Sequence, residues 1–263
     1  MDDNFLLNAS DGNPVRFNRL PVTESPFLLV GDHAGSAIPA SLGDLGLSAG
    51  DRHRHIALDL GVRELGEALG ERLQAPFVRQ HFSRLVCDCN RNPRDPEWAP
   101  AISDGTPIPG NRNLTEKDRQ ARRAAIFEPY HAAIAAALEA RAAKDASTIL
   151  VSLHSFTPNM AGEQRPWDIG ILHDGREDAF ALEVLDYLHG VEGLCVGDNQ
   201  PYKMDDTDYT VPRHAYPLGL AYIEIEVRQD HLADEAGISC MAQVLGDSLT
   251  AVLPKPDQKL DRF

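Results

Sequence analysis

Short apolar runs of strand length alternate along the chain with longer segments in which apolar residues recur every three or four positions. The runs predict buried strands at residues 27–30, 84–88, 148–153, 167–172, 194–196 and 220–228. The periodic segments predict helices at 58–73, from 115 to about 144, at 180–188 and at 238–252. Alternating strands and helices favour an α/β fold, in which helices cover both faces of a mostly parallel mixed sheet and form three α/β/α layers.

Two of the predicted helices carry further local signals. Thr115 with Asp118 three residues later resembles a capping box, and Pro129 is expected to kink or interrupt the helix that begins there. His55 and Asp59 lie four residues apart near the start of the helix at 58–73. Residues with that spacing share one helical face, so both side chains are expected to reach the same ligand.

One domain is expected over residues 1–263, because this length and an apolar fraction of 43% suffice for a single core. Prolines discourage regular structure in residues 1–26, which we interpret as an irregular leader, and residues 254–263 as a tail. Two long connections, at 93–113 and 197–217, are rich in turn formers. Such connections often bind ligands or close over a site.

Composition narrows the classes of partner. With 25 basic and 40 acidic residues the net charge is −15, which makes nucleic acids and anionic membranes unfavourable partners. No apolar run approaches the roughly 20 residues that span a bilayer, and the first residues lack the form of a signal peptide, so a cytoplasmic protein is expected. The four cysteines have no CxxC spacing, which excludes a zinc ribbon and gives no disulfide framework.

Two predicted strands lead directly to a histidine, the first to His33 and the third to His154. The carboxyl ends of parallel strands meet at one edge of the sheet, where open α/β sheets bind ligands. A catalytic zinc takes three protein ligands and a water molecule, and Asp59 or His55 is the candidate third ligand. A lone histidine at such a place is more often a capping or core-edge residue, but two of them favour a metal-dependent hydrolase.

The strand at 220–228 places Glu224, Glu226 and Arg228 on one face. An unpaired carboxylate in an apolar strand is expensive, so two interpretations stay open. One is a structural pair between a glutamate and Arg228. The other makes Glu226 a general base for metal-activated water and a proton donor to the leaving amine.

Arg84, Asn90 and Arg91 flank the predicted strand at 84–88. The planar guanidinium group binds carboxylates in a bidentate manner, so two arginines could hold a dianionic amino-acid product such as glutamate. Other hydrolase chemistry finds no support, because the chain has no GxSxG, HExxH, P-loop or GxGxxG motif.

Five separated motifs draw these candidates together. In chain order they are Asp32-His33-Ala34-Gly35 with Pro39, His55-Ile56-Ala57-Leu58-Asp59-Leu60-Gly61, Ser83-Arg84-Leu85-Val86 leading to Asp88-Cys89-Asn90-Arg91, Ser152-Leu153-His154-Ser155-Phe156-Thr157-Pro158, and Ile223-Glu224-Ile225-Glu226-Val227-Arg228. This order resembles the N-formylglutamate amidohydrolase family over about residues 27–252. Arg165-Pro166-Trp167 and Tyr209-Thr210 with His214-Ala215 agree with the same resemblance.

The resemblance implies the fold of the zinc carboxypeptidases and aspartoacylases, with Zn²⁺ or another divalent metal held by His33 and His154. Those relatives carry a glutamate ligand three residues after the first histidine, where this chain has Ser36. Asp59 is therefore assigned as the third ligand, ahead of His55 and Asp32. The resemblance also implies Glu226 as the general base, and it implies as substrate-binding residues Arg84, Asn90, Arg91, Arg165 and His214.

The reaction implied by the resemblance is hydrolysis of N-formyl-L-glutamate to formate and L-glutamate, in histidine degradation. The expected partner is thus a small anionic N-acyl amino acid, and the expected state is a monomer or small homo-oligomer. Two alternatives stay open. One is a deacylase or carboxypeptidase-like hydrolase of another small N-acyl amino acid, and the other is a non-catalytic binding protein with a degenerate site.

Overall fold

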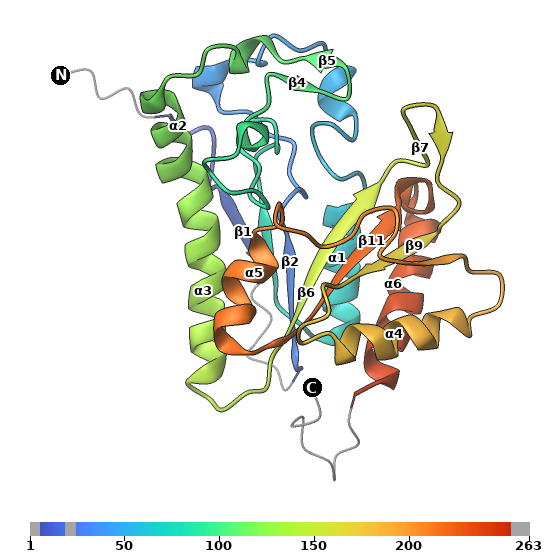
Figure 1. Cartoon of the computed structure of the whole chain (residues 1–263). Helices are drawn as coiled ribbons and strands as arrows, with labels where there is room; N and C mark the ends of the chain where they lie inside the picture. Colours follow the sequence, from blue (N-terminus) through green and yellow to red (C-terminus); the bar gives the residue numbers. More distant parts are fainter. Residues whose placement is uncertain (1–5, 19–24, 254–263) are drawn as a thin grey trace.

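A seven-stranded sheet forms the centre of the computed structural model, which describes residues 6–18 and 25–253 (Figure 1). In spatial order the strands are β1 (Val15–Asn18), β3 (Phe77–Gln80), β2 (Phe27–Gly31), β6 (Ile149–Phe156), β11 (Ala221–Arg228), β9 (Ile169–Leu172) and β10 (Val196–Asp198). Four neighbouring pairs are parallel, whereas β1 runs antiparallel to β3 and β9 to β11. The mostly parallel mixed sheet predicted from the sequence is confirmed.

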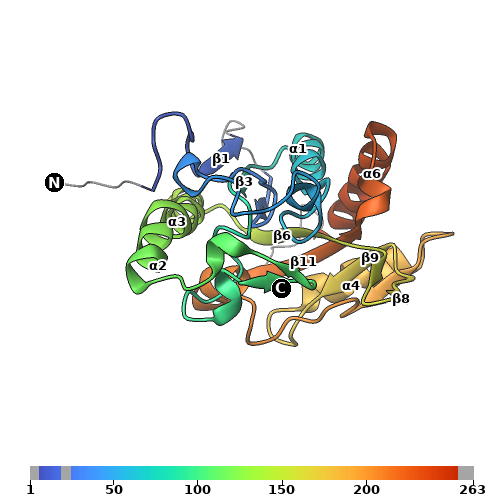
Figure 2. The ribbon, with the colours of Figure 1, turned by 90° about the horizontal axis from the view of Figure 1, so that it is seen from above.

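Helices cover both faces of this sheet. On one face pack α1 (Val62–Leu73), α4 (Ala179–His189) and α6 (Glu235–Ala251). On the other pack α3 (Glu128–Ala142), α5 (Thr210–His214) and buried parts of the long connections. Figure 2 shows α1 and α6 together along one side of β6 and β11. The three-layer α/β/α fold is therefore confirmed.

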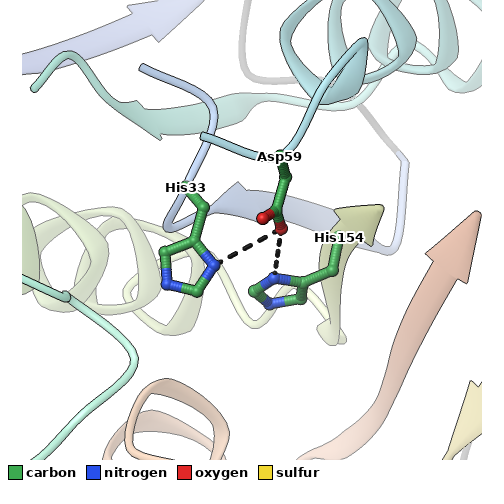
Figure 3. Close-up of side chains that lie close together, drawn as sticks. All are labelled: His33, Asp59 and His154. Atoms are coloured by element: carbon green, nitrogen blue, oxygen red, sulfur yellow. Dashed lines mark hydrogen bonds and ion pairs between the residues drawn. The ribbon is translucent and has the colours of Figure 1, made fainter. Parts of the chain in front are cut away.

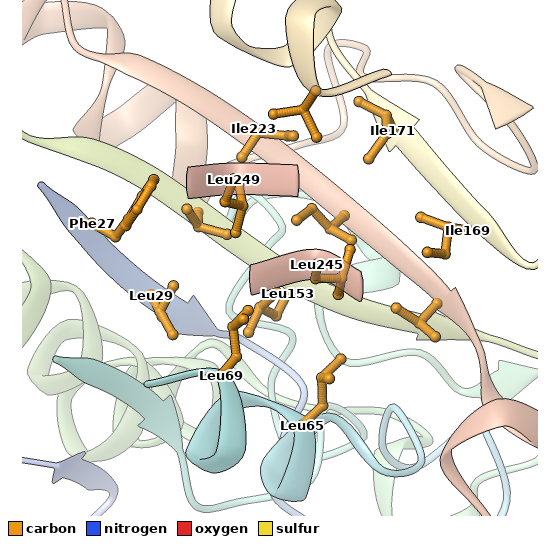
Figure 4. Packing of buried hydrophobic residues seen from close by; sticks show 14 of the residues in the cluster. Phe27, Leu29, Leu65, Leu69, Leu153, Ile169, Ile171, Ile223, Leu245 and Leu249 are labelled. Carbon is orange, nitrogen blue, oxygen red and sulfur yellow. The ribbon is translucent and has the colours of Figure 1, made fainter. Parts of the chain in front are cut away.

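The alternation of side chains along the central strands decides which layer holds the polar residues. Leu153 of β6 and Ile223 of β11 face the apolar cluster that α1 and α6 cover (Figure 4). Neighbouring side chains on a strand point to opposite faces, so His154 and Glu224 face the other layer. Glu226 lies on that same face, directly opposite His154 on the adjacent strand.

The strand predicted at residues 84–88 is wrong. This segment forms turns, and its apolar residues are buried by α3 and the long connections instead of by sheet neighbours. The sheet uses β3 instead, a four-residue strand that contains Arg79 and Gln80. Burial by loops produces the same apolar run as burial in a sheet, and the sequence pattern does not separate the two.

The irregular leader is also wrong in part, because β1 pairs along β3 at the edge of the sheet. Residues 1–5, 19–24 and the tail 254–263 lie outside the described residues. A further difference concerns the helix predicted at 58–73, since α1 begins only at Val62, after Gly61 with φ of +79°. His55 and Asp59 thus lie in the turns before α1, and the prediction that they share a helical face is wrong.

The helix predicted from residue 115 is present, with the Thr115 and Asp118 capping box in place. It comprises α2 (Glu116–Arg122), a π-helical turn (Arg123–Phe127) and α3. Pro129 stands in the first turn of α3, where its missing N–H breaks the regular hydrogen-bond pattern. The expected interruption is therefore observed.

Three connections reach the edge at which β6 and β11 end. The first, at 93–113, contains the small hairpin of β4 (Ile102–Ser103) and β5 (Thr106–Pro107). After β6 comes the hairpin of β7 (Asn159–Met160) and β8 (Glu163–Gln164). The connection at 197–217 leads through α5 into β11. Both long connections predicted from the sequence contribute residues to the cavity described next.

Candidate functional site

His33, Asp59 and His154 converge at the carboxyl edge of the sheet (Figure 3). His33 follows β2, Asp59 lies in the turn before α1, and His154 lies near the end of β6. All three side chains are buried, and one ligand atom from each lies within 4.8 Å of the others. The structure thus brings together the two histidines and the third residue preferred from the sequence.

Local backbone contacts explain how residues so distant in sequence meet. The Asp59 backbone N–H donates to the His33 carbonyl at 3.0 Å, and the Ser155 hydroxyl donates to the Leu60 carbonyl at 2.8 Å. Gly35 allows the His33 turn to pack closely, because a Cβ there would lie 2.1 Å from the His81 carbonyl oxygen. The turns after β2 and before α1 are therefore anchored to each other and to β6.

The distances within the cluster fit a metal site. Asp59 Oδ2 lies 3.3 Å from His33 Nδ1 and 2.9 Å from His154 Nδ1. Two ligand atoms of one tetrahedral zinc ion lie about 3.4 Å apart when each is about 2.1 Å from the metal. Two imidazole nitrogens and one carboxylate oxygen also form a donor set that catalytic zinc uses in proteins. The residues present therefore fit a divalent metal.

The remaining nitrogen of each ring has its own polar neighbour. His33 Nε2 lies 2.7 Å from Asp88 Oδ1, and His154 Nε2 lies 3.1 Å from Ser152 Oγ and 3.6 Å from Asp32 Oδ2. Metal-binding histidines typically donate their second N–H to a carboxylate or another acceptor, which fixes the tautomer and the ring orientation. Both rings are thus held with Nδ1 toward Asp59.

Electrostatics in the cluster favour charged forms despite burial. Burial opposes ionisation of Asp59, but His33 and His154 outweigh it and hold the pKa of this carboxyl well below its usual range. Burial also opposes the charged form of His154, yet Asp59 and the glutamates of β11 raise the pKa of this imidazole well above its usual value. The site is therefore built for positive charge between its carboxylates.

Arg84 is committed to this cluster. Its Nη2 donates to Asp88 Oδ2 at 2.7 Å, its Nε to the same oxygen at 3.1 Å, and its Nη1 to Asp59 Oδ1 at 3.3 Å. Burial alone would lower the pKa of Arg84, but the two carboxylates outweigh it and raise the pKa. Asp88 therefore links Arg84 to His33, a role that the sequence did not reveal.

Glu224 and Glu226 line the cavity beside the histidines. Glu226 is 7% exposed, and burial raises its pKa to about 7. Arg228 does not pair with either glutamate, because its ion pairs within the described residues are with Asp168 and Asp230. The structural glutamate–arginine pair considered from the sequence is therefore absent from this part of the chain.

The cavity around the cluster has a volume of about 710 Å³. Its walls come from the turns after β2 and before α1, from β6 and β11, and from both long connections. Asn90 and Arg91 both line it, but they differ in their contacts. Asn90 Oδ1 accepts from the backbone N–H groups of Tyr209 and Thr210 at 2.9 Å each, whereas Arg91 has no ion pair or side-chain hydrogen bond within the described ranges.

The other candidates from the sequence occupy different places. His55 lines the cavity at Asp104, 3.3 Å from that carboxylate, and Asp32 accepts a hydrogen bond from the Thr210 hydroxyl behind the cluster. Arg165 does not line the cavity itself but donates to the hydroxyl of Tyr202, which does. His214 lies outside the cavity lining, paired with His131. The structure does not bring Arg165 and His214 to the cluster.

Sequence reasoning missed two carboxylates that shape the site. Asp88 contacts both His33 and Arg84, and Asp208 lines the cavity beside Asn90. Asp88 interrupts a buried apolar run, and a charged residue in such a run needs partners, so this signal could have been used. Asp208 lies among several acidic residues of an irregular connection and offers no comparable signal.

The chain is similar to a known protein family over most of its length. Residues 25–233 match the model of the N-formylglutamate amidohydrolase family. The chain belongs to this family. A search of the curated proteins found no match.

Two solved structures support the assignment of the fold. A gene product of Agrobacterium tumefaciens is 35% identical, with a TM-score of 0.89, 94% of this chain covered and 99% of that chain. An N-formylglutamate amidohydrolase from Ralstonia eutropha is 22% identical, with a TM-score of 0.64, 91% of this chain covered and 96% of that chain. Within the described residues, none of the helices has the length and apolarity needed to cross a membrane.

Proposed function

We propose that the protein is a metal-dependent amidohydrolase that removes the formyl group of N-formyl amino acids. The observation that carries the proposal is the buried His33, Asp59 and His154 cluster, with Glu226 in the same cavity. N-formyl-L-glutamate is the reference substrate, because the family is named for it. Its hydrolysis would release formate and L-glutamate, which would place the enzyme in histidine degradation.

His33, Asp59 and His154 would hold the metal, and Zn²⁺ suits two imidazoles and a carboxylate. When bound, a divalent metal supplies Lewis-acid chemistry that polarises a carbonyl oxygen and activates water. Asp88 would fix the orientation of His33 through Nε2, and Arg84 would keep Asp88 and Asp59 ionised through its hydrogen bonds.

Glu226 would act as the general base. It would take a proton from the attacking water and return it to the amine nitrogen as the amide bond breaks. A pKa of about 7 suits both steps, because a group near neutrality accepts and releases a proton with similar ease. Its position directly opposite His154 on the neighbouring strand, about 5 Å away along the sheet, supports this role.

Arg91 would bind the α-carboxylate of the substrate. It lines the cavity and makes no side-chain hydrogen bond or ion pair within the described residues, so the donors of its guanidinium group are available. Asn90 would contribute by holding the turn at Tyr209 and Thr210 in place. Arg165 would support the cavity wall through Tyr202, and His214 would act only through its packing with His131.

A deacylase of another small N-acyl amino acid is the second candidate. It is favoured by Arg84, which is already paired with Asp88 and Asp59. One uncommitted cavity arginine then remains for the two carboxylates of N-formylglutamate, and the side-chain specificity of the site is open to test.

The first experiment measures metal content of protein purified without chelator or metal-affinity tag, together with formate release from N-formyl-L-glutamate before and after chelation. About one zinc per chain, and activity that chelation abolishes and zinc restores, are expected. A protein that holds no metal and gives no turnover after zinc is added would instead be a binding protein.

Glu226→Gln tests the assignment of the general base. The substitution keeps shape and polarity but removes the basic oxygen, so turnover should fall by roughly 10²- to 10⁴-fold. Metal content and calorimetric affinity for an N-formyl amino acid should stay close to those of the parent protein. Turnover within about threefold of the parent would assign the proton transfers to another group.

A further inference from the structure

The walls of the cavity carry far more acidic than basic side chains. Eight carboxyl side chains line it, of which Asp59 and Asp88 belong to the metal cluster, and six others remain against three permanently charged basic side chains, Arg84, Arg91 and Lys203. A site that binds a dianion is expected to show the opposite balance, because like charges in a partly enclosed cavity repel the ligand. The charge pattern therefore bears on which amino acid the site accepts.

Two of the three cations are poorly placed to bind a second carboxylate. Arg84 makes its hydrogen bonds to Asp88 and Asp59. Lys203 is exposed to solvent, which screens its charge. Arg91 makes no side-chain hydrogen bond or ion pair in the described ranges, so it can bind one carboxylate, which matches the α-carboxylate of an amino acid and leaves no buried cation for a second.

The inner wall presents carboxyl groups where a substrate side chain would lie. Glu224 is 3% exposed, lines the cavity, and has a buried Oε2 without a hydrogen-bond partner in the described ranges. Burial and the charge of Asp208 raise the pKa of Glu224 well above its usual range. Asp208 lines the same wall, held by the Asn90 amide at 3.2 Å and the Asp205 backbone N–H at 2.9 Å.

We propose that the amine half of the substrate carries a cationic side chain that Glu224 and Asp208 bind, so that N-formyl derivatives of lysine or arginine are preferred to N-formylglutamate. This inference rests on the proposed amide hydrolysis and narrows its substrate. A bound ammonium or guanidinium group favours the ionised form of Glu224 and satisfies its free oxygen with a charge-assisted hydrogen bond. A glutamate side chain at the same place meets two carboxyl groups.

The position of Glu224 in the sheet supports a long side chain. Glu224 and Glu226 lie on the same face of β11, two residues apart, which corresponds to about 7 Å along a strand. Glu224 is the one further from the carboxyl end, and therefore lies deeper in the cavity. With the reacting amide near Glu226, a basic side chain of four to six atoms is long enough to cover about 7 Å toward Glu224.

The test compares four substrates with the zinc-loaded protein, namely N-formyl derivatives of L-lysine, L-norleucine, L-glutamine and L-glutamate. Norleucine matches the lysine chain without its ammonium group. We expect kcat/KM to be highest for the lysine derivative, by at least about tenfold over the glutamate derivative. Calorimetric Kd values of the lysine and glutamate derivatives for the Glu226→Gln protein, which does not consume them, should show the same order.

Glu224→Gln is the decisive variant, because it removes the carboxyl group that a bound cation would ionise and keeps the shape. It should lower kcat/KM for the lysine derivative by at least about tenfold more than it lowers kcat/KM for the norleucine derivative. Asp208→Asn should act in the same direction. Asp206→Asn is the matched control, since it removes the same charge from an exposed residue of the same connection outside the cavity lining, and it should leave the substrate preference unchanged.

The outcomes separate this inference from the proposed function. If the glutamate derivative is preferred in both turnover and binding, the inference is overturned and the proposed amidohydrolase activity is supported. A lysine preference that Glu224→Gln leaves intact overturns the assignment to this wall. Absence of turnover with all four substrates contradicts the proposed hydrolysis, and the Kd values then decide the inference, which fails if the lysine derivative binds no more tightly than the glutamate derivative.

Discussion

The rings of His33 and His154 have centroids 4.9 Å apart, and those of a second buried pair, His131 and His214, are 5.2 Å apart. Each pair joins segments that are distant in the sequence. His131 and His214 belong to α3 and α5, and His33 and His154 lie at the edge of the sheet that borders this layer. The planes of the first pair meet at 61°, whereas those of the second are nearly stacked at 23°. Similar separation and burial therefore accompany two different arrangements.

Their partners differ more than their distances. The first pair has Asp59 between the two Nδ1 atoms, with Asp88 at the outer nitrogen of His33. In the second pair, His131 Nε2 lies 3.0 Å from the Cys89 carbonyl, which only accepts, so Nε2 carries the hydrogen. The neutral His131 ring then accepts at Nδ1, and His214 Nε2 donates to it at 3.0 Å.

The electrostatic consequence has opposite sign in the two pairs. Carboxylates raise the pKa of His154 well above its usual value. Burial and the charge of Arg213 lower the pKa of His214 to about 4, and burial lowers that of His131 well below its usual value. Burial of two imidazoles thus does not by itself make a metal site, because a carboxylate must converge on both rings.

The largest expected effect comes from removing that carboxylate. Asp59→Asn leaves two neutral ligands and takes away the negative charge between the rings. Metal content should fall far below one per chain, and kcat/KM should fall by more than the roughly 10- to 100-fold that loss of an outer partner causes. Metal analysis and formate release check this.

The matched variant for that experiment is His214→Gln in the second pair, which should keep its metal. Full metal content in Asp59→Asn would contradict the assignment of the third ligand and direct attention to Asp32 or His55.

A smaller effect is expected from Asp88→Asn. The amide oxygen still accepts from His33 Nε2, but the charge that orients the ring and balances Arg84 is lost. Metal affinity, measured by competition with a chromophoric chelator, should weaken by roughly 10- to 100-fold. An unchanged affinity would show that the packing around His33 orients the ring without the carboxylate.

Most of the fold followed from apolar patterns, and two of the errors in strand prediction share one physical cause. The strands at β2, β6 and β11 were predicted because buried parallel strands produce apolar runs. The segment at 84–88 shows a similar run because connections bury it, and β3 escaped notice because Arg79 and Gln80 interrupt its apolar character. Apolar runs report burial, and the element that causes the burial is a tertiary property.

The site residues show the same division between what a local pattern predicts and what tertiary contacts decide. His33 and His154 were found because each stands where a buried strand ends, which is a local signal. The role of Asp88 was not found, because it depends on contact with a residue 55 positions away in the chain. His214 was placed near the substrate by resemblance, yet its partner is His131, 83 positions away. Local patterns locate candidates, whereas partners across the fold decide what each candidate does.

The smallest expected effect concerns His214 of the second pair, and it is a change in the free energy of unfolding and not in activity. The unfolded chain binds a proton at His214 near its ordinary pKa of about 6.5, whereas the folded protein excludes that proton until about pH 4. The stability that this group contributes is therefore complete above about pH 6.5 and is lost as the pH falls toward 4, by up to about 1.4 kcal/mol per pH unit.

In His214→Gln, whose amide still donates to His131, the free energy of unfolding measured with denaturant from pH 7 to 4 should depend on pH with a slope smaller by about that amount. Both proteins are measured after chelation, so that titration of His33 and His154 cancels in the difference. Equal slopes would mean that His214 has the same pKa in the folded and unfolded states, and that the two histidine pairs do not differ in the way their partners imply.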